Sequence, residues 1–207
     1  MKRLLFLLIL PFMAVSVMAQ SYDEGLPVRF SGSSPGITDF LNAILSQEDC
    51  GELLGAYAQH WKQYRKGQKL SPGVKITVDQ KNGYVCYEQT YPEDDSRVTV
   101  ETCYWNCKDG RHKLIAQSIM TYQHGRRLCA QYDGITFYRY DAARRRMKWE
   151  SAYDLCGEAF TDVANKDGTI ISLPRIGKDV QLSERTATGK RHYVLEWTGN
   201  GFKFKRR

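Results

Sequence analysis

The apolar positions of residues 37–45 recur with the period of an α-helix. They fall at i, i+3, i+4, i+7 and i+8, which places them on one face: Ile37, Phe40, Leu41, Ile44 and Leu45. A second helix is predicted directly afterwards. Asp49 and Glu52 have the spacing of a capping box, and Gly67 is a natural C-cap. We therefore expect a helical hairpin over residues 37–66.

From residue 74 the apolar period changes from helical to alternating. Val74, Ile76 and Val78 alternate with polar residues, which is typical of a half-buried strand. Asn82-Gly83 is a strong hairpin signal, and further glycine turns follow at hairpin spacing. The sequence between these turns has no helical stretch long enough for a parallel crossover, so the sheet is predicted to be antiparallel.

These patterns together predict a mainly β (α+β) fold. The N-terminal helical hairpin is followed by a large antiparallel meander over residues 74–205. A meander of about ten strands must curl into a barrel or split into a sandwich, and both alternatives stay open at this point.

The N-terminus has the pattern of a cleaved secretory signal. A short positive region precedes a nearly unbroken apolar stretch over residues 4–15, and Val17 and Ala19 stand at −3 and −1 of a cut before Gln20. The apolar run is shorter than the roughly 20 residues that a membrane-spanning helix needs. We expect an exported protein, periplasmic, cell-surface or extracellular, with no transmembrane segment in the mature chain.

The expected organisation is a signal peptide over residues 1–19, an extended lead-in over residues 20–36, and a single α+β domain over residues 37–207. The full chain has a formal charge of +7, and removal of the signal leaves 28 cations against 23 acids, a charge of +5. That balance favours weak attraction to anionic surfaces and argues against nucleic acid as a partner. An anionic glycan, an envelope surface or another protein remain as partner classes.

The mature chain holds six cysteines: Cys50, Cys86, Cys103, Cys107, Cys129 and Cys156. An even count in an exported protein predicts disulfides, and six cysteines allow 15 complete pairings. A turn centred on residues 94–95 sets Cys86 opposite Cys103, the one pair that we single out as a disulfide.

The same register has an unfavourable consequence. It also sets Glu88 opposite Glu101, a like-charge pair that destabilises a sheet. A slip of two positions sets Thr99 opposite Glu88 instead, so the sequence leaves both registers open.

A search for catalytic and cofactor motifs assigns no catalytic residue, no metal ligand and no cofactor. The chain lacks H-E-x-x-H and the phosphate-binding glycine loops, and Ser33-Ser34, within Gly32-Ser33-Ser34-Pro35-Gly36, lie in the extended lead-in and are interpreted as linker rather than nucleophile. Cys107 and His112 flank the Asp109-Gly110 turn and would form a thiol–imidazole pair there, but a hairpin end lacks the enclosure that catalysis needs.

The candidate binding residues are three arginines and two flanking tyrosines: Arg144, Arg145, Arg146, Tyr138 and Tyr140. Aromatic rings interleaved with arginines stack on planar groups and hold phosphates. The alternative is a solvated loop above a packed sheet, which is the ordinary setting of a charge run.

Three stretches carry a resemblance to known proteins. CYWNCKDGRHKL over residues 103–114, residues 132–147, and LPRIGKD over residues 173–179 resemble a group of secreted Bacteroidetes proteins with no assigned activity. The resemblance implies an exported protein, and it supplies no functional residues to carry over.

Three functional hypotheses follow. The leading one is an exported, non-enzymatic binding or interaction domain whose ligand the sequence does not name. The first alternative is a secreted or periplasmic hydrolase acting on glycans or peptides, with its site assembled from distant strands. The second is a structural subunit of a cell-envelope assembly. A pocket with convergent polar groups would favour a small ligand or catalysis.

Overall fold

The computed structural model describes residues 24–47, 51–128, 130, 133–166 and 168–207. Of these residues, 45% lie in strands and 23% in helices, so the protein is mainly β as predicted. The expected signal peptide, residues 1–19, lies outside the described residues.

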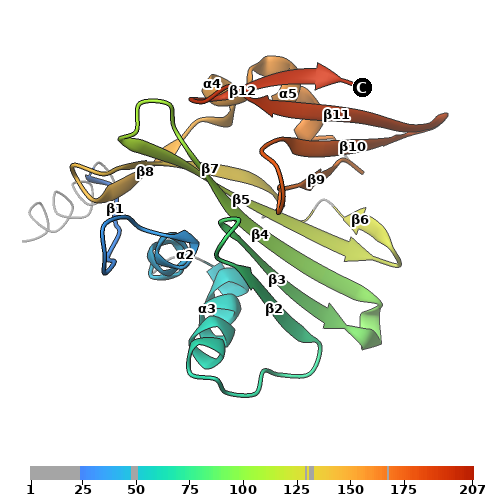
Figure 1. Cartoon of the computed structure of the whole chain (residues 1–207). Helices are drawn as coiled ribbons and strands as arrows, with labels where there is room; N and C mark the ends of the chain where they lie inside the picture. Colours follow the sequence, from blue (N-terminus) through green and yellow to red (C-terminus); the bar gives the residue numbers. More distant parts are fainter. Residues whose placement is uncertain (1–23, 48–50, 129, 131–132, 167) are drawn as a thin grey trace, which may run out of the picture.

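A large antiparallel sheet forms a half-barrel through the middle of the molecule (Figure 1). Successive hairpins place neighbouring strands of the sequence side by side, as the meander pattern predicts. In spatial order its strands are β1 (Leu26–Pro27), β8 (Arg146–Glu150), β7 (Gly134–Asp141), β5 (His112–Gln123), β4 (Ser96–Asn106), β3 (Tyr84–Tyr91) and β2 (Val74–Asp79), with β6 (Arg126–Leu128) paired to β5.

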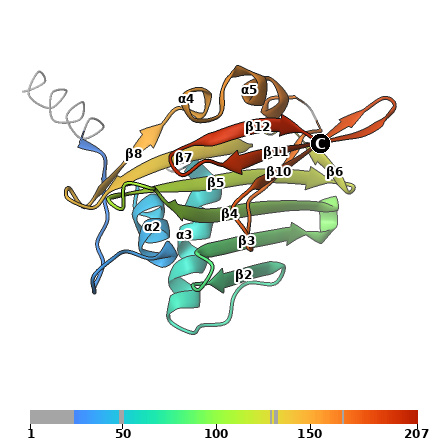
Figure 2. The same ribbon diagram turned by 45° about the horizontal axis from the view of Figure 1, so that its top comes forward.

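A second, smaller sheet packs against one face of the large sheet, which we call its inner face (Figures 1 and 2). Neither alternative of the sequence analysis, a single barrel or a simple sandwich, describes this arrangement fully. The small sheet is also antiparallel, in the order β12 (Phe202–Arg206), β11 (Gly189–Trp197), β10 (Val180–Thr186) and β9 (Ile170–Ser172).

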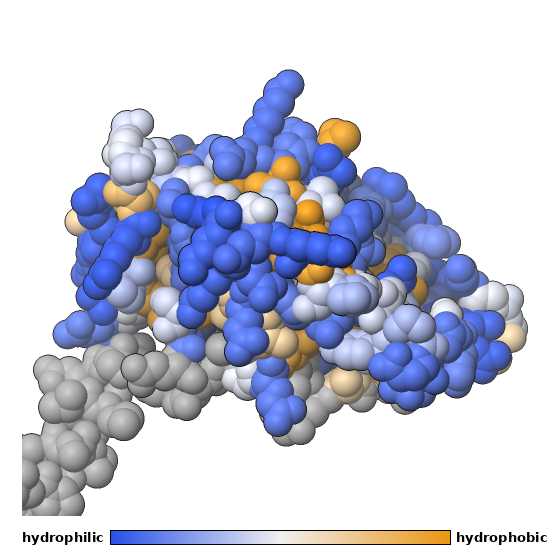
Figure 3. Space-filling model, turned by 90° about the horizontal axis from the view of Figure 1, so that it is seen from below, coloured by the Kyte–Doolittle hydropathy of each residue, from blue (hydrophilic) through white to orange (hydrophobic). Residues whose placement is uncertain are grey.

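Two helices cover the opposite, outer face of the large sheet: α2 (Ile37–Leu45) and α3 (Gly51–Arg65). All five apolar positions predicted for α2 are buried. Trp61 on α3 donates from Nε1 to Oδ1 of Asn42 on α2 at 2.7 Å, which ties the helices together. Residues 48–50 between them lie outside the described residues, so the hairpin as a unit stays a prediction. The side of the molecule that carries α3 is mostly hydrophilic (Figure 3).

The sequence analysis missed two short helices and the role of the lead-in. α4 (Ala152–Cys156) and α5 (Glu158–Ala164) cover the small sheet, within the range for which the sequence analysis predicts only strands (Figure 2). Phe160 on α5 contacts Phe204 with ring centroids 6.1 Å apart. Within the lead-in, β1 pairs with β8, so this segment is part of the large sheet.

One apolar contact fixes the small sheet at one end of the inner face. Trp105 on β4 stacks against Trp197 with centroids 5.7 Å apart and meets Phe202 edge-on at 5.1 Å. Its indole Nε1 donates to the carbonyl oxygen of Lys178 at 2.8 Å. The two sheets therefore share one core at this end.

The observed register corrects the expected disulfide. Cys86 lies opposite Glu101, and Cys103 lies opposite Tyr84. The slip arises because the short 3-10 helix η1 (Pro92–Asp94) and the left-handed Asp95 fill the turn, so the strands close at residues 91 and 96. Cys86 and Cys103 both carry free thiols, as do the two other cysteines that the structure describes.

Candidate functional site

The inner face of the large sheet is apolar where the small sheet covers it and polar where it does not. On β4, Val98 and Val100 face the helices, and the alternate residues Arg97, Thr99 and Glu101 face the other way. The uncovered part forms a hollow of about 290 Å³. We call it the polar groove, and its lining residues are Tyr84, Cys86, Glu88, Arg97, Thr99, Glu101, Ser118, Met120, Tyr122, Ile171 and Ser172.

Glu101 lines the polar groove and connects the two sheets. Its Oε1 accepts a hydrogen bond from the Tyr84 hydroxyl at 2.6 Å, and its Oε2 accepts one from the backbone N–H of Leu173 at 2.8 Å. Burial raises the pKa of Glu101, the two hydrogen bonds oppose that rise, and the charge of Glu88 adds to it. The carboxyl group is thus held in place with both oxygens engaged.

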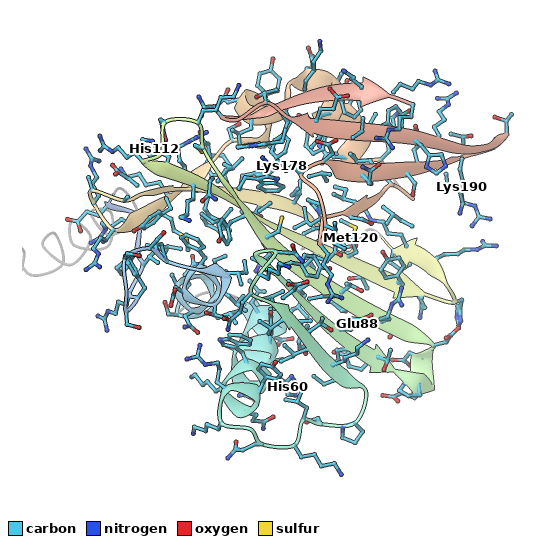
Figure 4. All side chains as sticks on the ribbon, in the orientation of Figure 1. His60, Glu88, His112, Met120, Lys178 and Lys190 are labelled. Carbon is cyan, nitrogen blue, oxygen red and sulfur yellow. The ribbon has the colours of Figure 1, made fainter. Side chains whose placement is uncertain are left out.

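Glu88 supplies a second carboxylate on the same face. It lies opposite Thr99, two residues from Glu101, so the two glutamates are diagonal neighbours. Such neighbours lie about 7–8 Å apart, with their Cβ atoms somewhat closer. Nζ of Lys75 lies 3.5 Å from Oε2 of Glu88, so the more accessible carboxylate has a cation beside it. Figure 4 shows Glu88 and Met120 on this side of the sheet.

The remaining wall combines hydroxyl groups, a guanidinium and an aromatic ring. The guanidinium of Arg97 lies over the ring of Tyr122, 4.7 Å from its centroid. Thr99 and the exposed Ser172 add hydroxyl groups that both donate and accept hydrogen bonds. The polar groove therefore presents donors, acceptors and a ring face to the same space.

The tyrosines that the sequence analysis selected lie mainly inside the molecule. Tyr140 is 1% exposed and meets Phe40 edge-on at 5.3 Å. Tyr138 is half-buried on the same side of the sheet. Arg144 is exposed, with Nε 3.8 Å from Oδ2 of Asp141.

The other two selected arginines contact the lead-in. The guanidinium of Arg145 lies 4.3 Å from the ring centroid of Phe30. Arg146 donates to the backbone carbonyls of Glu24 and Gly25 and forms an ion pair with the Glu24 carboxylate at 3.3 Å. The structure thus brings these side chains together around the N-terminal segment, and ligand binding by them stays a prediction.

Cys107 and His112 do not form a thiol–imidazole pair. The Nδ1 atom of His112 lies 2.6 Å from Oδ2 of Asp109, and Oδ1 of the same carboxylate accepts hydrogen bonds from the backbone N–H groups of residues 111 and 112. Cys107 is 4% exposed, and burial raises the pKa of its thiol. Within the described residues, no group of three His, Cys, Asp or Glu side chains is arranged to hold a metal ion.

The sequence analysis missed the polar groove, although one signal for it was present. The strand with Val98 and Val100 carries polar residues at every alternate position from Arg97 to Glu101. That pattern indicates a polar face, but it does not show that a second sheet turns this face into a groove.

In the part of the chain that the structure describes, no helix combines the length and the apolar character that a bilayer crossing needs. Comparison with protein families, with curated proteins and with solved structures gives no match to this chain.

Proposed function

We propose that this protein is an exported, non-enzymatic binding domain that holds a small hydroxyl-rich ligand, such as a short neutral saccharide, in the polar groove. The observation that carries the proposal is the uncovered polar part of the inner face. There, carboxylates, hydroxyl groups, a guanidinium and tyrosine rings converge on one hollow.

The chemistry of the groove fits a saccharide better than an apolar ligand. Sugar hydroxyls both donate and accept, so they need mixed partners such as Glu88, Arg97 and Thr99. A tyrosine ring such as Tyr122 offers a rigid apolar face with a polar tip. At about 290 Å³, the hollow is near the lower end of the roughly 300–1,000 Å³ of small-molecule pockets, which indicates a small ligand.

The state of Glu101 favours binding over catalysis. Both of its oxygens accept hydrogen bonds from the protein, one of them from a backbone N–H that ties the small sheet to the large one. A carboxyl group that transfers protons needs access to the reacting atom. The two bonds support a structural and orienting role for Glu101.

One observation favours the alternative of a glycan hydrolase. Glu101 has a raised pKa, and Glu88 is its diagonal neighbour beside a lysine. Glycoside hydrolases usually cleave glycosidic bonds with two carboxyl groups whose environments give them different pKa values. In that alternative, Glu101 is the acid and Glu88 the base or nucleophile.

The test is an NMR titration of the protein with a panel of neutral mono- and disaccharides. We expect saturable shifts of amides around Thr99 and Tyr122. Glu88→Gln should weaken binding by about 10-fold or more, because a hydrogen bond to a charged group contributes about 1.5–3 kcal/mol. Glu158→Gln, an exposed change on α5, is the matched control and should bind as the parent does.

Two results would count against this function. The absence of shifts at the groove with every saccharide of the panel would remove the ligand class. Hydrolysis of a chromogenic glycoside that disappears in Glu101→Gln, with folding retained, would establish the hydrolase instead. Export is tested separately: the N-terminal residue of protein recovered outside the inner membrane should be Gln20.

A further inference from the structure

A second hollow lies where β6 meets the small sheet, and it is rich in cations. Of its eight described lining residues, four are cationic and none is acidic. We call this hollow of about 240 Å³ the basic groove, defined by Arg126, Arg127, Ser183, Arg185 and Lys190. It shares no lining residue with the polar groove.

Two of these cations are held against each other by the sheet. Arg185 on β10 and Lys190 on β11 are direct partners in the register. Side chains so placed have Cβ atoms about 4.5–5.5 Å apart, and like charges there destabilise the sheet. Among the described residues, neither of them has a carboxylate within 4.0 Å, and the same holds for Arg126.

Arg127 provides an independent observation. Its side chain is 3% exposed, and its Nε has no hydrogen-bond partner among the described atoms. Among the described residues, the nearest carboxylate oxygen is Oδ2 of Asp133, which lies 3.7 Å from Nε, too far for a hydrogen bond. Its Nη1 donates to the carbonyl of Thr169. An unpaired N–H of a buried guanidinium costs free energy, and a hydrogen-bond acceptor beside it would remove that cost.

We infer that the basic groove binds a sulfate or phosphate ester group of a soluble ligand. Guanidinium groups present paired donors that match the oxygens of such groups, and the lysine adds a point charge. The anion would neutralise the repulsion between Arg185 and Lys190 and accept the unused N–H of Arg127. The volume is below the roughly 300 Å³ of pockets for drug-sized ligands, which fits one charged group with the rest of the ligand outside.

The position of the groove supports access for such a ligand. Lys190 lies at the free end of the β10–β11 hairpin, on the side of the molecule away from His112 (Figure 4). Both Arg126 and Lys190 are exposed. An ester group from solvent therefore reaches these two cations directly.

The test is an NMR titration of the protein with sodium sulfate, sodium phosphate and a sulfated disaccharide, with chloride adjusted to constant ionic strength. Saturable shifts are expected at Gly125 and Ser183. The double variant Arg185→Gln/Lys190→Gln should lose at least 10-fold in affinity for all three probes. The control is Lys62→Gln/Lys66→Gln, which removes two exposed charges from the α3 side and should leave the affinity unchanged.

Thermal unfolding separates loss of the site from loss of the fold. In the absence of anion, the double variant should melt at or above the temperature of the parent, because the like-charge repulsion is removed. Sulfate should raise the melting temperature of the parent and of the control but not that of the double variant. If the double variant melts well below the parent, Lys190→Gln alone takes its place. This single variant should also lose at least 10-fold in affinity for the three probes.

Three results would overturn the inference. The first is the absence of a saturable response to sulfate, phosphate and the sulfated disaccharide. The second is equal affinity in the parent and the variant. The third is binding to vesicles of anionic phospholipid without binding to any soluble probe, which would make a membrane the source of the phosphate. The inference does not rest on the proposed function: Glu88→Gln should retain sulfate binding, and the Arg185/Lys190 variant should retain saccharide binding.

Discussion

The attachment of the small sheet to the large one should depend on Trp105. This side chain is 5% exposed, contacts two aromatic rings of the small sheet and donates a hydrogen bond to the carbonyl of Lys178. We expect Trp105→Ala to destabilise the protein strongly, and Trp105→Phe to do so less, because phenylalanine keeps ring contacts but leaves the Lys178 carbonyl without its donor.

The size of each effect follows from these contacts. Truncation of a buried tryptophan to alanine costs about 3–5 kcal/mol. The orphaned carbonyl in Trp105→Phe costs about 1–3 kcal/mol. For a domain of this length, 1 kcal/mol corresponds to roughly 2–4 °C in melting temperature. Trp105→Ala should therefore lower the melting temperature by about 6–20 °C.

Urea unfolding followed by tryptophan fluorescence and far-ultraviolet circular dichroism measures these losses. The matched control is Trp149→Ala, because Trp149 is 67% exposed. Its cost should stay within about 0.5 kcal/mol, as for most surface substitutions. If Trp105→Ala costs no more than Trp149→Ala, the contact does not hold the sheets together and the reasoning is refuted.

Three further predictions concern pH, thiol reactivity and backbone geometry. The hydrogen bonds from the His112 side chain and from backbone N–H groups lower the pKa of Asp109 to about 2. The contribution of Asp109 to stability is therefore present above the ordinary aspartate pKa of about 3.9 and is lost as pH falls toward 2. Asp109→Asn should flatten the dependence of the urea midpoint on pH in that range. An unchanged slope would show that Asp109 does not contribute to stability in this way. Burial raises the pKa of Cys86 to about 11. Iodoacetamide at pH 8 should therefore label this thiol slowly in the native protein and quickly in urea. Equal labelling rates would show that the thiol is open to solvent. Gly73→Ala should destabilise the protein more than Gly110→Ala. Both glycines have a positive φ, which costs alanine about 1–2 kcal/mol, but of these two positions only Gly73 would place the new Cβ 2.5 Å from a backbone carbonyl oxygen. Equal urea midpoints of the two variants would contradict this prediction.

The elements with strong periodicity were predictable from the sequence. The α2 stripe and the alternation from Val74 onward both depend on local spacing, and both elements form. The helices α4 and α5 have five and seven residues, too few to be stable on their own. They form because Phe160 and Leu155 pack against the shared core, which a local pattern does not reveal.

Local sequence patterns did not determine the β3–β4 register or the polar groove. The β3–β4 register was left open between two values, and the conformation of the turn at η1 and Asp95 decided it. The polar groove depends on how far the small sheet extends over the inner face. Arg146 illustrates the same limit, because its partner Glu24 is 122 residues away in the chain.

β1 occupies the hydrogen-bonding edge of β8 and thereby protects the protein from self-association. An open edge strand is a template for pairing with a second molecule, and proline and lysine residues discourage it. In β1, Pro27 offers no N–H to an incoming strand, and at the edge of the small sheet Lys203 and Lys205 alternate with phenylalanines. Because Arg146 holds β1 in place through the carbonyls of residues 24 and 25, its loss would expose the edge of β8 and turn it into a starting point for aggregation.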